Sequence, residues 1–173
     1  MKWWRQQNNP APLLMSEEEV YNSADSFPIE FRDMQQRRRV LYGPDPIADL
    51  KIENTHYRTQ VEHELRAKLL RLRQQGAAVL SDGPALLALC AESVSTFCVL
   101  GRHALTLSGG APDVDRRALV RQLAARIPAD LASFETLLDI REGKGSPSTV
   151  PMELFAKYLV SIGELVTFVD GLV

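Results

Sequence analysis

The sequence predicts a mainly α protein, with a bundle of about five helices over residues 54–173 and a short strand-containing segment over residues 1–53. Two observations support this prediction. Apolar residues recur at helical spacing almost without interruption after residue 54. Before it, apolar runs are short, and this third of the chain holds both tryptophans and half of the ten prolines. We therefore expect a boundary near Glu53.

Five helices are expected in the second part. Tyr57, Val61, Leu65, Leu69 and Leu72 share one face of a helix that we expect to end near Val79. A second long helix begins at Pro84, is apolar on several sides and ends at Gly109–Gly110. Shorter amphipathic helices are expected over 113–127 and 130–141. After a loop over 143–148, a helix with alternating apolar spacings of three and four begins at Met152, as in bundle cores.

The first part is predicted to contain both a helix and strands. Ser16 and Glu19 have the spacing of a capping box, which indicates a short helix ending near Ala24. The segment from Phe27 to Asp33 then has Phe27, Ile29 and Phe31 at alternate positions, with Glu30 and Arg32 on the opposite face, which is the period of a half-buried strand. A shorter second strand is expected at 40–42, followed by a turn at 43–46.

Composition excludes several classes of protein. Twenty basic against twenty-two acidic residues leave a net charge of -2, which argues against general binding of nucleic acid or of an anionic membrane. Residues 1–5 have no apolar signal core and no run reaches about 18 consecutive apolar residues, so we expect neither a signal sequence nor a membrane span. Cys90 and Cys98 are expected to lie about 12 Å apart along one helix, too far for a disulfide. We therefore expect reduced thiols and a cytoplasmic protein.

One or two strands do not make a stable sheet, because both edges keep unpaired amides. The predicted strand Phe27–Phe31 therefore needs additional strands. These would come from a partner chain, from a second copy in a homodimer, or from a preceding part of a longer protein.

Several segments resemble bacterial nucleotidyltransferase-domain proteins, in which a polymerase-beta-like domain precedes a helical bundle. The resemblance lies in 27–34 (FPIEFRDM), 40–43 (VLYG), 45–47 (DPI) and 57–73 (YRTQVEHELRAKLLRLR). It implies that residues 1–53 are a remnant of an α/β nucleotidyltransferase domain and that residues 1–7 are the end of one of its helices. The family's Gly-Ser turn and metal-binding Asp-x-Asp strand do not precede Phe27.

This difference bears on catalysis, because nucleotidyl transfer uses two divalent ions held by clustered carboxylates. The resemblance places Glu30 at the family's third metal carboxylate, with Asp33 at the end of the same strand. Mg²⁺ is expected only where a complete site is assembled. The alternative for Glu30 is a solvated strand residue, and for Asp33 a turn contact.

The basic segment of the first long helix is the next candidate. Arg66, Lys68, Arg71 and Arg73 are suited to phosphate groups, but at 100° per residue they do not form one patch. Pairs such as Glu62 with Arg66 and Glu64 with Lys68 favour a solvated face. A polar stripe beside the apolar one is the candidate substrate-binding surface, and it consists of Gln60, Glu64, Lys68 and Arg71.

Three functions follow from these patterns. The first is a nucleotidyltransferase-related protein whose helical part binds a substrate such as a nucleoside triphosphate and which does not catalyse transfer alone. The second is an interaction module that pairs the Phe27–Phe31 strand with another chain or copy. The third rests on a resemblance to helical-bundle toxin ribonucleases, whose Arg and His spacing is met by Arg58 and His63, although a five-residue offset turns these side chains about 140° apart.

Overall fold

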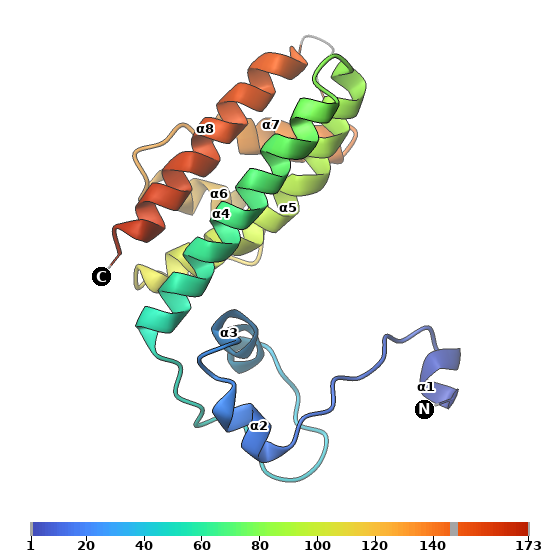
Figure 1. Cartoon of the computed structure of the whole chain (residues 1–173), viewed down its shortest axis with the longest axis vertical. Helices are drawn as coiled ribbons and strands as arrows, with labels where there is room; N and C mark the ends of the chain where they lie inside the picture. The colour runs from blue at the N-terminus through green and yellow to red at the C-terminus, as the bar shows by residue number, and fades with distance from the viewer. Residues whose placement is uncertain (1, 146–148, 173) are drawn as a thin grey trace. The chain divides into compact units, whose positions relative to one another are not determined.

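The computed structural model describes residues 2–145 and 149–172, which form eight α-helices and no β-strand (Figure 1). The chain divides after Glu53 into two compact units. The prediction of a mainly α protein is confirmed, whereas the predicted strands are absent from the described residues.

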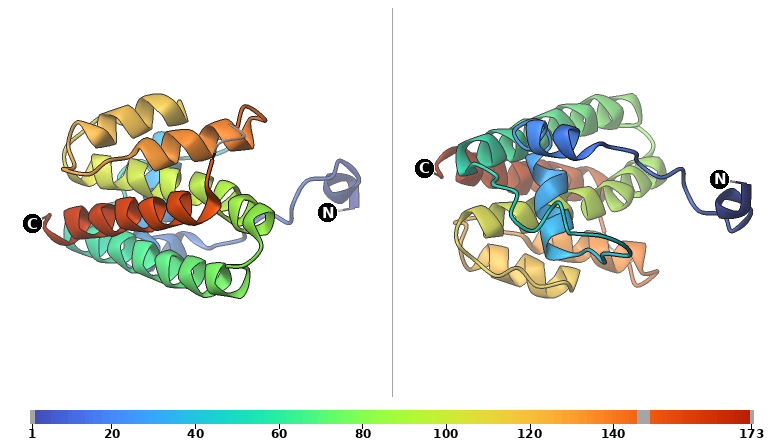
Figure 2. Two further views of the ribbon diagram at one scale, coloured as in Figure 1. Left: turned by 90° about the horizontal axis from the view of Figure 1, so that it is seen from above. Right: turned by 90° about the horizontal axis from the view of Figure 1, so that it is seen from below.

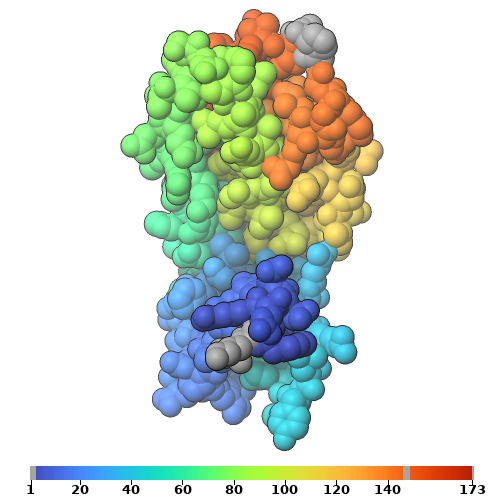
Figure 3. Space-filling view, turned by 90° about the vertical axis from the view of Figure 1, so that its right-hand side faces the viewer, coloured from blue at the N-terminus to red at the C-terminus, as the bar shows by residue number. Residues whose placement is uncertain are grey.

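The second unit contains the five expected helices. They are α4 (Asn54–Ala78), α5 (Gly83–Leu107), α6 (Arg116–Ala124), α7 (Ala132–Arg141) and α8 (Pro151–Asp170). Helix α4 runs antiparallel to α5 and α8, and α5 lies between α4 on one side and α6 and α7 on the other (Figures 1 and 2). Figure 3 shows one face of this unit, with α5 between α4 and the shorter helices.

Helix α5 is central because it packs against all four other helices of the unit. Among the described helices, α5 alone is long and apolar enough to cross a membrane. The core helices of soluble bundles meet the same criterion. The start of α5 is fixed by Asp82, whose carboxylate accepts a hydrogen bond from the backbone N–H of Ala85 at 3.0 Å. Just after its end, Gly109 has a backbone φ of +74°, a conformation that residues other than glycine rarely adopt.

The core of the second unit is built from the apolar stripes that the sequence predicts. The stripe of α4, from Tyr57 to Leu72, is fully or almost fully buried. The ring of Tyr158 on α8 makes edge contacts with Phe97 on α5 and Phe134 on α7, at centroid distances of 5.8 and 5.1 Å. Cys90 and Cys98 are buried free thiols, as expected.

The first unit contains three short helices, α1 (Lys2–Gln6), α2 (Glu17–Asn22) and α3 (Pro28–Gln36). The capping box of α2 is present as predicted. The Ser16 hydroxyl accepts from the N–H of Glu19 at 3.1 Å, and the Glu19 carboxylate accepts from the N–H of Ser16 at 2.6 Å.

The strand predicted from Phe27 to Asp33 is wrong, because these residues begin α3. Pro28 occupies the first turn of the helix, where its fixed φ is favourable and its missing N–H costs nothing. Pro28 and Phe31 are buried and Gln35 is half-buried, so their spacing of three and four is helical. The predicted strand Val40–Tyr42 is also wrong, since it is an irregular segment in which Leu41 and Tyr42 are exposed.

Gln35 of α3 and Arg38, just after the helix, hold the irregular segment that follows. The Gln35 amide donates to the carbonyls of Leu50 at 2.7 Å and of Ile47 at 3.3 Å. The guanidinium of Arg38 binds the carboxylate of Asp45 at 2.6 Å. The backbone carbonyls of Ile47 and Leu50 are therefore paired with a side chain rather than with a neighbouring strand. The predicted loop over 143–148 begins as expected at Gly143, whereas residues 146–148 lie outside the described residues.

Candidate functional site

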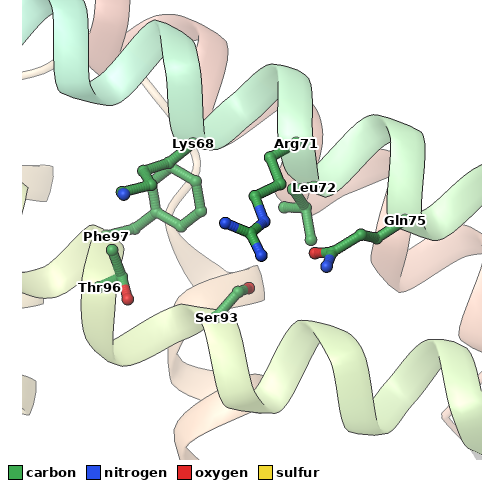
Figure 4. A pocket seen from close by; sticks show the side chains of 7 residues that line it. All are labelled: Lys68, Arg71, Leu72, Gln75, Ser93, Thr96 and Phe97. Atoms are coloured by element: carbon green, nitrogen blue, oxygen red, sulfur yellow. The ribbon is translucent and has the colours of Figure 1, made fainter.

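A pocket of about 240 Å³ opens between α4 and α5 (Figure 4). Its walls come from two short stretches that face each other where the antiparallel helices meet. Leu72 and Phe97 are buried there, whereas polar side chains form most of the remaining lining. The full lining consists of Lys68, Arg71, Leu72, Gln75, Ser93, Thr96 and Phe97.

The α4 side of the pocket carries two cations. Lys68 and Arg71 are three residues apart, so they project from neighbouring positions of one helix face. Figure 4 shows the Arg71 guanidinium directed into the space between the helices, with the Gln75 amide beside it. Lys68 has an ion pair with Glu64 at 3.5 Å. Among the described residues, Arg71 has no hydrogen-bond or ion-pair partner, so all its donors remain available to a ligand.

The α5 side presents hydroxyl groups. Ser93 donates to the backbone carbonyl of Cys90 at 2.8 Å, and its oxygen lies 3.1 Å from the phenol oxygen of Tyr158. Burial raises the pKa of Tyr158, which keeps the phenol protonated. Thr96 lies one turn further along α5 and is exposed.

This arrangement suits a small anion. Lys and Arg side chains only donate hydrogen bonds, and the planar guanidinium binds two oxygens of a phosphate or carboxylate at once. Pockets for whole drug-sized ligands usually enclose about 300–1,000 Å³. At about 240 Å³, this pocket has room for a phosphate or diphosphate group, with the rest of a larger ligand extending into solvent.

The structure brings together two of the four residues of the predicted substrate-binding stripe. Lys68 and Arg71 line the pocket, whereas Gln60 and Glu64 do not. Gln60 and Glu64 lie earlier on the same helix, where the Gln60 amide donates to the Glu64 carboxylate at 3.5 Å. The predicted pairs Glu62–Arg66 and Glu64–Lys68 are both present, the first at 2.7 Å.

The candidate catalytic residues Glu30 and Asp33, of which Glu30 is also the candidate metal ligand, lie on α3 rather than on a strand. Glu30 is exposed and Asp33 is half-buried, one turn further along. Within residues 2–145 and 149–172, no three His, Cys, Asp or Glu side chains are grouped closely enough to hold a metal ion. Glu30 is thus not joined there by the two additional carboxylates of a two-ion centre.

The Arg58 and His63 pair of the ribonuclease hypothesis is not aligned on one helix face. Arg58 binds the carboxylate of Glu62 at 3.1 Å and approaches Asp170, near the end of α8, at 4.0 Å. His63 is exposed on α4. Arg58 is therefore engaged in contacts with α4 and α8.

Sequence reasoning did not identify the pocket residues Gln75, Ser93 and Thr96. A signal for the latter two was present, because they are polar residues three positions apart in a largely apolar helix. That spacing places them on one face. Which face of α4 they meet depends on helix packing, which the sequence pattern does not fix.

Comparison with known proteins finds no matching family model, no similar curated protein and no similar solved structure.

Proposed function

We propose that this chain is a nucleotidyltransferase-related binding protein whose helical bundle holds a phosphate-bearing ligand between α4 and α5. One observation carries the proposal. The unpaired guanidinium of Arg71 and the ammonium of Lys68 open on one pocket that also offers amide and hydroxyl groups. The resemblance of residues 27–73 to the nucleotidyltransferase family supports a nucleotide or another phosphate compound as the ligand.

The proposed role is binding without catalysis by this chain alone. Residues 1–26 contain no Gly-Ser followed by an Asp-x-Asp motif. Without these carboxylates, the polyphosphate would not be held by two metal ions in line with an acceptor. Purified protein given each nucleoside triphosphate, Mg²⁺ or Mn²⁺ and candidate acceptors is expected to incorporate no nucleotide. Incorporation that disappears in Glu30→Gln would refute this part of the proposal.

The binding part is tested by calorimetric titration with pyrophosphate. Arg71→Ala is expected to weaken binding by about tenfold or more, because a hydrogen bond between charged groups contributes roughly 1.5–3 kcal/mol. Arg73→Ala is the matched control, since it removes the same charge from an exposed position of α4 outside the pocket lining. A comparable loss in both variants would indicate general charge attraction and contradict the proposed site.

Glu64 provides a second test with the opposite sign. Its carboxylate competes with an anionic ligand for Lys68, at 3.5 Å from the ammonium. Glu64→Gln removes the negative charge while keeping the shape of the side chain, so we expect tighter pyrophosphate binding. Weaker binding in this variant would place the anion away from Lys68.

A further inference from the structure

The hydroxyl of Ser93 donates its single proton to a hydrogen bond within the protein. A serine hydroxyl has one proton and two acceptor lone pairs. The Ser93 proton is donated to the Cys90 carbonyl at 2.8 Å. The contact of 3.1 Å with Tyr158 therefore has the phenol as donor and Ser93 as acceptor. One lone pair of Ser93 remains, and Figure 4 shows this oxygen facing the α4 side chains across the pocket.

The phenol proton of Tyr158 is likewise held in a hydrogen bond within the protein. Tyr158 is fully buried, and its phenol has Ser93 as its hydrogen-bond partner among the described residues. Turning the Ser93 proton toward the pocket would break its bond to the Cys90 carbonyl. The α5 wall therefore offers an acceptor at Ser93, opposite the donors of Lys68 and Arg71 on α4.

We propose that the α4–α5 pocket selects an oxyanion that carries its own hydroxyl proton, and that it binds hydrogen phosphate in preference to sulfate. The inference rests on the proposed function, because it presupposes that an anion occupies the pocket. At neutral pH both ions carry up to two negative charges on a tetrahedron of oxygens, but only phosphate retains a P–OH group. That proton is donated to Ser93, whereas sulfate places an acceptor against the Ser93 lone pair. A site of this kind rejects the ion that lacks the donor, because a polar group then stays unpaired.

The same chemistry extends to ligands in which a phosphate is joined to a hydroxyl-bearing group. A phosphate monoester loses its last acidic proton near pH 6, so above that pH an adjacent hydroxyl must supply the donor to Ser93. Inorganic phosphate is the cleaner probe, because it keeps one proton throughout the neutral range.

The test is calorimetric titration of the full chain with sodium phosphate and with sodium sulfate at pH 7.5 and equal ionic strength. We expect phosphate to bind about tenfold or more tightly than sulfate, the difference expected for one hydrogen bond to a charged group. In Ser93→Ala, phosphate affinity is expected to fall to the level of sulfate, while sulfate affinity stays the same or rises.

Two further variants separate this role from a general effect on the pocket. Thr96→Ala removes a hydroxyl that can turn its proton either way, so it is expected to leave the ratio of the two affinities unchanged. Tyr158→Phe removes the donor to Ser93 but keeps the acceptor, so the preference for phosphate should persist. Circular dichroism spectra and melting curves verify that each variant is folded, and Tyr158→Phe still tests the acceptor if Ser93→Ala does not fold.

The outcomes distinguish the two proposals. Equal binding of phosphate and sulfate by the wild-type protein overturns the selectivity and leaves the anion pocket in place. Binding of neither ion, together with no effect of Arg71→Ala on pyrophosphate, overturns both. A preference that survives in folded Ser93→Ala, or is lost in Tyr158→Phe, overturns the assignment to the Ser93 acceptor.

Discussion

Gly76 on α4 lies directly against the ring of Phe155 on α8. A Cβ atom at Gly76 would stand 2.9 Å from Cε2 of that ring and closer still to Cζ. The two helices approach here because glycine has no side chain, and Phe155 fills the space that a side chain would occupy. The contact lies near the C-terminal end of α4 and the N-terminal end of α8.

Gly76→Ala is expected to lower the free energy of unfolding by about 1–2 kcal/mol. Overpacking against the buried Phe155 ring costs roughly 1–3 kcal/mol, and the better helix propensity of alanine offsets up to about 1 kcal/mol of that. Gly163→Ala is the matched control, because this position in α8 has no atom within 4 Å of an added Cβ. Urea denaturation should show Gly163→Ala stabilised by about 0.5–1 kcal/mol. A stabilised Gly76→Ala would show that α4 and α8 separate easily.

Asp82 is expected to determine how firmly α5 begins. Its carboxylate accepts from the N–H of Ala85 at 3.0 Å, so Asp82→Ala leaves a helix donor without this partner. We expect a loss of about 0.5–2 kcal/mol in the free energy of unfolding. Asp82→Asn keeps the acceptor and should lose only the interaction with the helix dipole, about 0.3–1 kcal/mol. Equal losses for the two variants would assign the effect to charge rather than to capping.

The bundle was predictable because each of its long helices repeats its apolar pattern over several turns. The stripe from Tyr57 to Leu72 has no other periodic interpretation, and glycine or proline marks the ends of α5 and α8. The segment from Phe27 to Asp33 was too short for this, since seven residues do not separate a period of 2 from one of 3.6. Pro28 at the first helical position was the decisive signal.

The pocket was half predictable for a related reason. Lys68 and Arg71 are conspicuous in sequence because they are charged residues beside an apolar stripe. Ser93 faces Lys68 and Arg71 only because α5 packs against α4, and its hydroxyl contacts Tyr158, which is 65 residues away and on another helix. Such a hydrogen-bond chain depends on tertiary packing, which a periodic pattern on one helix does not encode.

Cys90 and Cys98 are expected to make the protein sensitive to alkali. Burial raises the pKa of each thiol from 9.0 to about 11. In the unfolded chain the thiols lose their protons near pH 9, whereas in the folded chain they keep them until about pH 11. The unfolded state therefore binds fewer protons in this window, and the free energy of unfolding falls as pH rises from 9 to 11. The stabilisation is fully present below pH 9.

A shift of two pKa units corresponds to about 3 kcal/mol per thiol in total, because one unit is worth about 1.4 kcal/mol, and about 2 kcal/mol of this is lost between pH 9 and pH 11. Urea denaturation at intervals from pH 8 to pH 11 measures the slope. The double variant Cys90→Ala/Cys98→Ala lowers stability at every pH by creating small cavities, but its slope should be shallower than that of the wild type. Tyr158 contributes to the remaining slope above pH 10, since burial also raises its pKa and the double variant retains it. Identical slopes in the two proteins would mean that the thiols ionise at the same pH folded and unfolded, and hence that water reaches both of them in the native bundle.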